Sequence, residues 1–264
     1  MGEWQVTDER PLGTRSVIAS ALLGVRPPRL RTRTLLRACA LFDISEGAGR
    51  VALSRMVSAG ELVADGDGYA LAGLLLDRSA RQDRSAEPAV GAWKPGDGWT
   101  TAIVTGEARP AAERAALRRA AADLRLAELR EGVWVRPDNL GRSDGPAAAV
   151  VRAQCLTGTA TFDTDEAALA TRLWDLAGWN ERARRLERAL ARSLPALDGE
   201  GQRVLAGAFV LSAAVWRHLQ ADPLLPAGLL PATWGGDDLR DAHRRWRVVF
   251  DRAWVAWTRV DDRL

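Results

Sequence analysis

Residues 46–59, EGAGRVALSRMVSA, carry hydrogen-bond donors at a regular spacing. On a helix, Arg50, Ser54 and Arg55 lie on or beside one side, whereas the opposite side collects apolar residues, namely Ala52, Leu53, Met56 and Val57. Guanidinium and hydroxyl groups in this arrangement can bond phosphate oxygens or the edges of bases. The segment is therefore a candidate for contacting a nucleic acid. An ordinary amphipathic helix with a solvated basic side has the same pattern, and the alternative stays open at this point.

Other reactive residue types are isolated along the chain. Cys39 and Cys155 stand in apolar company and have no partner at metal-ligand spacing, so we expect buried thiols. His218 and His243 are equally isolated. We therefore expect no metal, no cofactor and no catalytic cluster, and the protein is not predicted to be an enzyme.

Positive charge is concentrated near the start of the chain, although the net charge is only +3. Between residues 15 and 60, Asp43 and Glu46 are the only acids beside eight arginines, which are Arg15, Arg26, Arg29, Arg31, Arg33, Arg37, Arg50 and Arg55. Such asymmetry is expected where one end of a protein meets a polyanion. The sequence has neither a membrane-spanning apolar run nor a signal-peptide pattern, which predicts a cytoplasmic protein that does not contact a membrane.

The elements around residues 46–59 follow the order of a winged helix-turn-helix. Helices are predicted at 14–24, 32–41 and 46–59, followed by strands at 62–63 and 69–71 around the turn DGDG. Ser45 is expected to cap the third helix and Gly60 to end it. Arg33 and Arg37 should lie on the outside of the second helix. Arginines at helix ends neutralise phosphates, which adds Arg31 and Arg33 to the candidates.

The turn between the two strands carries Asp65 and Asp67. Phosphates would repel these carboxylates, so we do not expect the tip of the hairpin to contact a DNA backbone.

The remaining chain divides into an α/β segment and a helical segment. After a charged helix over 73–87 and a Pro/Gly-rich boundary, strands are predicted at 99–104, 124–129, 132–137 and 148–157, with a helix at 110–124 and only a loop at 138–146. This order suggests a small ferredoxin-like domain. Helices follow at 165–179, 180–194, 202–219 and 237–258, the last with Trp246, Trp254 and Trp257 as core residues. The fold class is thus α+β, with domains at 1–88, 89–162 and 163–264.

Three motifs resemble the PaaX family of bacterial repressors, named for control of phenylacetic acid degradation. RVALSRMVSAGELV (50–63) is similar to the family's recognition helix and wing entry. DGWTTAIV (97–104) with LREGVWVRPDNL (129–140) resembles its central domain, which is similar to the Cas2 ferredoxin-like fold. DPLLPAGLLPATWGG (222–236) resembles its C-terminal signature. The match spans the chain in the right order.

The resemblance implies a homodimeric transcriptional repressor that binds a double-stranded DNA operator and is released by an aryl-acyl-CoA effector, phenylacetyl-CoA in the namesake. Arg50 and Arg55 occupy positions where the family motif also has basic residues, so the DNA-contact role carries over to them. The acidic wing and the short loop at 138–147 depart from the family pattern. No effector-binding residue can be carried over.

Two further functions are alternatives to a repressor. A Cas2-like nuclease needs carboxylates that converge on a divalent cation, and Glu107, just after the first central strand, is the only candidate. A protein-interaction module with an incidental basic front is the third alternative. The preferred reading assigns DNA contact to Arg31, Arg33, Arg50, Ser54 and Arg55.

Overall fold

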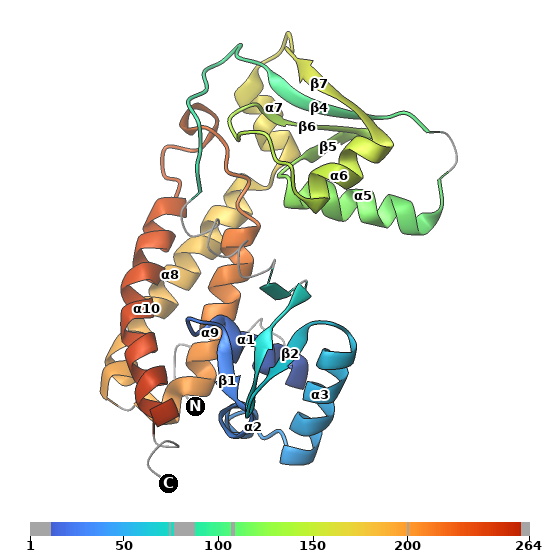
Figure 1. The fold of residues 1–264 in the computed structure, drawn as a ribbon. Helices are drawn as coiled ribbons and strands as arrows, with labels where there is room; N and C mark the ends of the chain where they lie inside the picture. Colours follow the sequence, from blue (N-terminus) through green and yellow to red (C-terminus); the bar gives the residue numbers. More distant parts are fainter. Residues whose placement is uncertain (1–11, 74, 77–87, 107–108, 200, 260–264) are drawn as a thin grey trace. The chain divides into compact units, whose positions relative to one another are not determined.

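The computed structural model describes residues 12–73, 75–76, 88–106, 109–199 and 201–259 (Figure 1). The chain is a mixed α+β protein, as predicted, with two small antiparallel sheets. It forms two compact units, of which the first comprises Met1–Glu87, Glu181–Ala221 and Gly235–Leu264 and the second Pro88–Asn180 and Asp222–Trp234. The segment 163–264 thus supplies residues to both units. Within the described ranges, every helix is too short or too polar to cross a bilayer.

The N-terminal part of the first unit contains three helices and a three-stranded sheet. Its elements are α1 (Thr14–Leu23), β1 (Arg29–Arg31), α2 (Thr32–Ala40), α3 (Glu46–Ser58), β2 (Leu62–Asp65) and β3 (Gly68–Leu71). The three predicted helices and the hairpin are confirmed. Val17, Ile18, Ala21 and Leu22 are buried on α1, as their spacing predicted. Most of the predicted charged helix over 73–87 lies outside the described residues.

Strand β1 was not predicted. It has three residues and pairs with β3, so that the sheet order is β1-β3-β2. Gly68 lies opposite Arg31 in this pairing, and a Cβ atom there would lie 2.2 Å from the carbonyl oxygen of Leu30. Glycine at position 68 therefore allows β1 to approach the hairpin.

Three long helices complete the first unit: α8 (Leu176–Gly199) from residue 181 onward, α9 (Gly201–Gln220) and α10 (Gly236–Arg259). The buried side of α10 is aromatic, with Trp246 and Trp254 fully enclosed and Trp257 buried. The Trp246 indole N–H donates to the Ser193 hydroxyl of α8 at 2.8 Å. The prediction that these tryptophans form a core is confirmed.

The second unit is built on a four-stranded sheet with the order β5-β6-β4-β7. Its elements are β4 (Trp99–Val104), α5 (Ala111–Asp123), β5 (Ala127–Arg130), β6 (Val133–Pro137), α6 (Pro146–Gln154), β7 (Cys155–Ala160) and α7 (Glu166–Leu173). Helices α5 and α6 pack on one face, where Ala102, Trp134 and Cys155 meet Leu117 and Val151.

The predicted strand at 148–157 is wrong for most of its length, and a second helix, which was not predicted, follows the loop at 138–145. Residues 146–154 form α6, and the strand begins only at Cys155. Pro146 stands at the start of the helix and three alanines follow, a sequence that favours a helix. Val150 and Val151 suggested a strand because β-branched residues are common there.

A second correction concerns the predicted helices 165–179 and 180–194. The chain instead breaks at Trp174 and Asp175, between α7 and α8. The Asp175 carboxylate accepts a hydrogen bond from the Gly178 N–H at 2.9 Å, which caps the start of α8.

The loop after β6 and the segment 222–234 are joined in this unit. Asn139 donates from its side chain to the carbonyl oxygen of Leu224 at 2.7 Å. Leu224 has a positive φ of 54°, and the Asp222 carboxylate accepts a hydrogen bond from its N–H at 2.8 Å. Two motifs that lie 85 residues apart in the sequence are thus parts of one structure.

Candidate nucleic-acid interface

Helix α3 has a well-defined start and end. The Ser45 hydroxyl accepts a hydrogen bond from the Ala48 N–H at 3.3 Å, as expected of an N-cap. At the other end Gly60 has a φ of 69°, and its N–H and that of Glu61 bond the carbonyl oxygens of Val57 and Met56. This is a Schellman motif. Both predicted end signals are confirmed.

Helix α3 also packs closely on α2. A Cβ atom on Gly49 would lie 2.7 Å from the Cδ2 atom of Leu36, so this glycine permits the short separation. Leu53 and Met56 are buried on the same side of α3. Because this side is fixed against the protein, the opposite side of the helix must face outward.

The outer face of α3 consists of six exposed residues at helical spacing: Gly47, Arg50, Val51, Ser54, Arg55 and Ser58. Arg50 donates to the Glu46 carboxylate one turn earlier at 2.7 Å. Arg55 forms no ion pair among the residues that the structure describes. Ser58 donates from its hydroxyl to the backbone carbonyl oxygen of Ser54 at 3.1 Å, and Ser54 is exposed. The sequence-predicted residues Arg50, Ser54 and Arg55 therefore share one exposed face.

Val51 belongs to this face and was not predicted as a site residue. Val51 is 51% exposed and stands between Arg50 and Ser54 on this face, although valine is usually buried in a folded protein. Its position on the polar side of the helical pattern was the sequence signal that could have identified it as exposed. A methyl-bearing side chain among arginines can contact the methyl group of thymine.

A groove of about 650 Å³ adjoins this face. It is lined from β1, α2, α3 and the hairpin by Arg31, Arg33, Arg37, Arg50, Glu46 and Asp67, together with Thr32, Leu36 and Ala40. The four arginines outnumber the two carboxylates, so the lining of the groove has a net positive charge. It brings together Arg31, Arg33 and Arg50, three of the predicted site residues.

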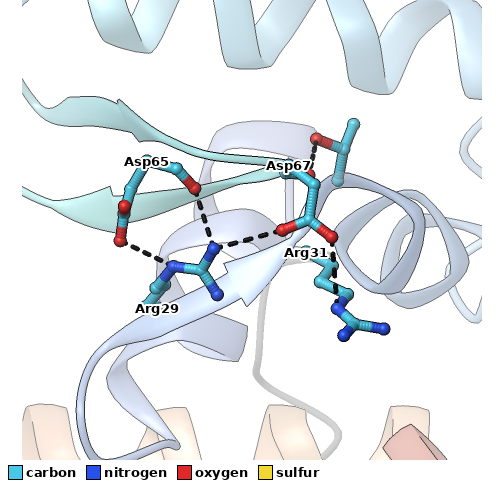
Figure 2. Close-up of polar contacts among 5 residues, drawn as sticks. Arg29, Arg31, Asp65 and Asp67 are labelled. Carbon is cyan, nitrogen blue, oxygen red and sulfur yellow. Dashed lines mark hydrogen bonds and ion pairs between the residues drawn. The ribbon is translucent and has the colours of Figure 1, made fainter. Parts of the chain in front are cut away.

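The predicted residues of β1 and α2 differ in their surroundings. Arg31 is paired with Asp67, with its Nε atom 3.2 Å from Oδ2 (Figure 2). Arg33 is exposed in the first turn of α2. A phosphate would have to compete with Asp67 for Arg31.

The prediction that Arg37 lies outside is wrong. Its side chain is half-buried, its guanidinium carbon lies 4.1 Å from the centre of the Trp257 ring, and Nη2 donates to the Trp257 carbonyl oxygen at 3.2 Å. Helix α2 contacts α10 through this residue, so a position that helical periodicity assigns to solvent lies in an internal interface. Ala40, predicted to be buried, is exposed.

The described residues contain no group of three or more histidine, cysteine, aspartate or glutamate side chains that could hold a metal ion. Cys39 and Cys155 are free and buried, and burial raises the pKa of both thiols, which makes them poor nucleophiles. Glu107, the candidate nuclease residue, lies outside the described residues.

Comparisons with known proteins give one match over the N-terminal region and one over most of the chain. The sequence profile described as PaaX-like protein matches residues 13–75, a range that includes α1, α2, α3 and the hairpin. Over the whole chain, the fold is similar to a solved structure of the uncharacterized protein Rv0674 from Mycobacterium tuberculosis. The two are 41% identical with a TM-score of 0.67, and the similarity covers 92% of this chain and 97% of that one. No curated protein matches the sequence.

Proposed function

We propose that this chain, which belongs to the PaaX-like family, is a transcriptional regulator that binds double-stranded DNA through the outer face of α3. One observation carries the proposal: Arg50, Ser54 and Arg55 lie together on the exposed side of a helix whose other side is fixed against the protein. Arginines in such a position can pair with phosphates or with the O6 and N7 atoms of guanine.

The element order supports a winged helix-turn-helix. Three helices are followed by the β2–β3 hairpin, which is the wing in this interpretation, and β1 completes the small sheet. In helix-turn-helix proteins the recognition helix enters the major groove, which is about 12 Å wide. Helix α3 has that role in our proposal, and the start of α2, with Arg33, lies toward the backbone.

The second unit supports a ferredoxin-like, Cas2-like central domain. Its elements follow the order strand, helix, strand, strand, helix, strand, and its sheet has the order β5-β6-β4-β7. From the family we further infer a homodimer that acts as a repressor in the cytoplasm and is released by an aryl-acyl-CoA such as phenylacetyl-CoA. We propose DNA binding rather than DNA cleavage, because no described cluster of carboxylates favours the nuclease.

The main experiment measures operator binding by variants of α3. Genomic fragments retained by the purified protein identify an operator, and its affinity is then measured for Arg50→Ala and Arg55→Ala. A lost bidentate contact costs about 1–3 kcal/mol, which is roughly a 5- to 150-fold weaker binding. Arg185→Ala is the matched control, because Arg185 is exposed on α8 and is paired with Glu181 four residues earlier, as Arg50 is with Glu46.

The proposal fails if both α3 variants bind the operator as tightly as the parent and the control at moderate salt. Incubation of the same DNA with Mg²⁺ or Mn²⁺ tests the nuclease alternative, for which cut DNA is the expected product. Retarded and intact DNA supports the regulator. Addition of phenylacetyl-CoA and other acyl-CoAs to the complex then tests whether an effector releases it.

Val51 provides a test at the level of a single methyl group. Replacement of thymine by uracil in the operator removes the 5-methyl group and leaves base pairing intact. We expect a loss of a few-fold in affinity at the thymine that Val51 contacts, and no further loss from the same replacement when Val51→Ala is the protein. Equal losses for parent and variant at every thymine would exclude this contact.

A further inference from the structure

The tip of the β2–β3 hairpin, residues 65–68, forms a network of ion pairs with β1 (Figure 2). Arg29 donates from Nε to the Asp65 carboxylate at 2.6 Å, and from Nη2 to the Asp65 carbonyl oxygen at 2.9 Å and the Asp67 carboxylate at 3.1 Å. Arg31 contacts the other oxygen of Asp67 at 3.2 Å. The two carboxylates thus occupy the two arginines of β1.

The backbone holds the partners of this network in place. The N–H and the hydroxyl of Thr32 both donate to the Asp67 carbonyl oxygen, at 3.0 and 2.8 Å. Strand β1 runs beside β3 with Arg31 opposite Gly68, and Gly66 has the positive φ that the turn needs. The arrangement is therefore fixed by sheet pairing as well as by charge.

The network is exposed to solvent and contributes little to stability. Its four side chains are between 35% and 61% exposed, and exposed ion pairs are weak. The hydrogen bond that Arg29 donates to the Asp65 carboxylate raises the pKa of the Arg29 guanidinium, which is consistent with a close pair. An exposed pair of this kind still changes what the surface can bind, since a paired arginine is less available to a phosphate and the carboxylate repels it.

We propose that Asp65 and Asp67 limit binding to DNA of arbitrary sequence by holding Arg29 and Arg31 in internal ion pairs. Binding without sequence preference depends almost entirely on the number of phosphates that arginine and lysine neutralise. Because the hairpin tip pairs with Arg29 and Arg31, these two arginines, beside the outer face of α3, do not neutralise phosphates. Recognition then depends more on α3, whose contacts with bases distinguish one sequence from another. The inference rests on the proposed function.

The test compares the affinities of charge variants for a duplex of random sequence. Asp65→Asn with Asp67→Asn removes both negative charges and keeps side-chain oxygens that accept hydrogen bonds. We expect about a tenfold tighter binding at low salt, and a steeper dependence on salt by about 1.8 in log–log slope if both arginines reach phosphates. The matched control is Glu181→Gln with Asp241→Asn, which changes the net charge equally at two exposed pairs of α8 and α10.

A second set of variants distinguishes an effect of the ion pairs on DNA binding from an effect of net charge or of misfolding. Arg29→Ala with Arg31→Ala should leave the salt slope of random-duplex binding unchanged in the parent, because no phosphate contact is lost, although the two unpaired carboxylates will weaken the affinity. The same substitutions should abolish the gain in the Asp65→Asn, Asp67→Asn background. Thermal unfolding of each variant establishes that it is folded.

Two outcomes would overturn the inference. One is a gain from the hairpin variant no larger than that of the control. The other is an equal decrease in the salt slope on substitution of the two arginines in both backgrounds. Failure of the proposed function looks different: the parent would then bind no operator, whereas failure of this inference leaves operator binding intact and changes only the random-duplex comparison.

Discussion

The outer face of α3 and the buried side of α10 are helical surfaces of the same unit with opposite chemistry. On α3 the outer face carries small residues, Val51 and two arginines, whereas Leu53, Met56 and the close approach at Gly49 pack the other side against the protein. On α10 the inward positions carry a continuous aromatic stripe. Substitutions on one surface should therefore change DNA binding, and those on the other should change stability.

Arginines of the same unit also differ in their surroundings. Arg55 on α3 is exposed, whereas Arg37 on α2 lies over the ring of Trp257 and contacts its backbone. A count of arginines in the first sixty residues therefore overestimates the charge that a ligand meets. Which partner each arginine has decides its role.

The largest expected effect is on the α10 side. Trp246→Ala should lower the free energy of unfolding by about 3–5 kcal/mol, because it removes a fully buried ring that stacks on Phe250 and leaves the Ser193 hydroxyl without its donor. Urea denaturation measures the change. Val248→Ala, at an exposed position of the same helix, should stay within about 0.5 kcal/mol of the parent. If the folded fraction of Trp246→Ala binds the operator more weakly than the parent, the α10 side affects DNA binding as well as stability, which contradicts the comparison.

A smaller effect concerns His243, which α10 buries between Trp216 and Trp246. Burial lowers the pKa of His243 to about 3. The unfolded chain takes up this proton near pH 6.5 while the folded chain does not, so stability is lost as the pH falls below that value. Between pH 7 and 5 we expect a loss of about 2 kcal/mol in the free energy of unfolding.

His243→Phe isolates this contribution, because the variant has no imidazole to protonate in the unfolded state. Urea denaturation of parent and variant at pH 7 and pH 5 gives the difference between their pH dependences. A parent and variant that lose the same stability over this interval would show that His243 is not kept neutral by the fold.

The smallest expected effect returns to the outer face of α3. Glu46→Gln removes the carboxylate that pairs with Arg50 at 2.7 Å, so Arg50 becomes available to DNA and a repelling charge is lost. We expect operator binding to tighten by a few-fold. Because Glu46 stands in the first turn of α3, the variant should also lose about 0.3–1 kcal/mol of stability. Weaker binding by the variant would indicate that Glu46 itself contacts the operator.

Local signals were sufficient to predict much of this architecture. The cap at Ser45 and the stop at Gly60 gave the limits of α3, and helical spacing identified Arg50, Ser54 and Arg55 as exposed. Strand β1 was missed because three residues have no measurable period and the strand exists only through its pairing with β3. Helix α6 could not be predicted with the same certainty, because its two valines favour a strand whereas Pro146 and the alanines favour a helix.

The partners of the arginines could not be predicted from local pattern. Asp65 lies 36 residues from Arg29, and Trp257 lies 220 residues from Arg37. Helical periodicity indicates one inward side only, so it cannot show that the other side of α2 meets α10. For the same reason, the sequence pattern of the acidic turn does not reveal the arginines that it binds.

The distance along the chain between Arg37 and Trp257 has a consequence for biosynthesis. At about 5–20 residues per second, a ribosome adds the tryptophan roughly 11–44 s after the arginine, a separation of 220 residues. Throughout that interval α2 has no α10 to pack against. The first unit, which contains the residues translated first, can therefore form in full only after α10 has been synthesised.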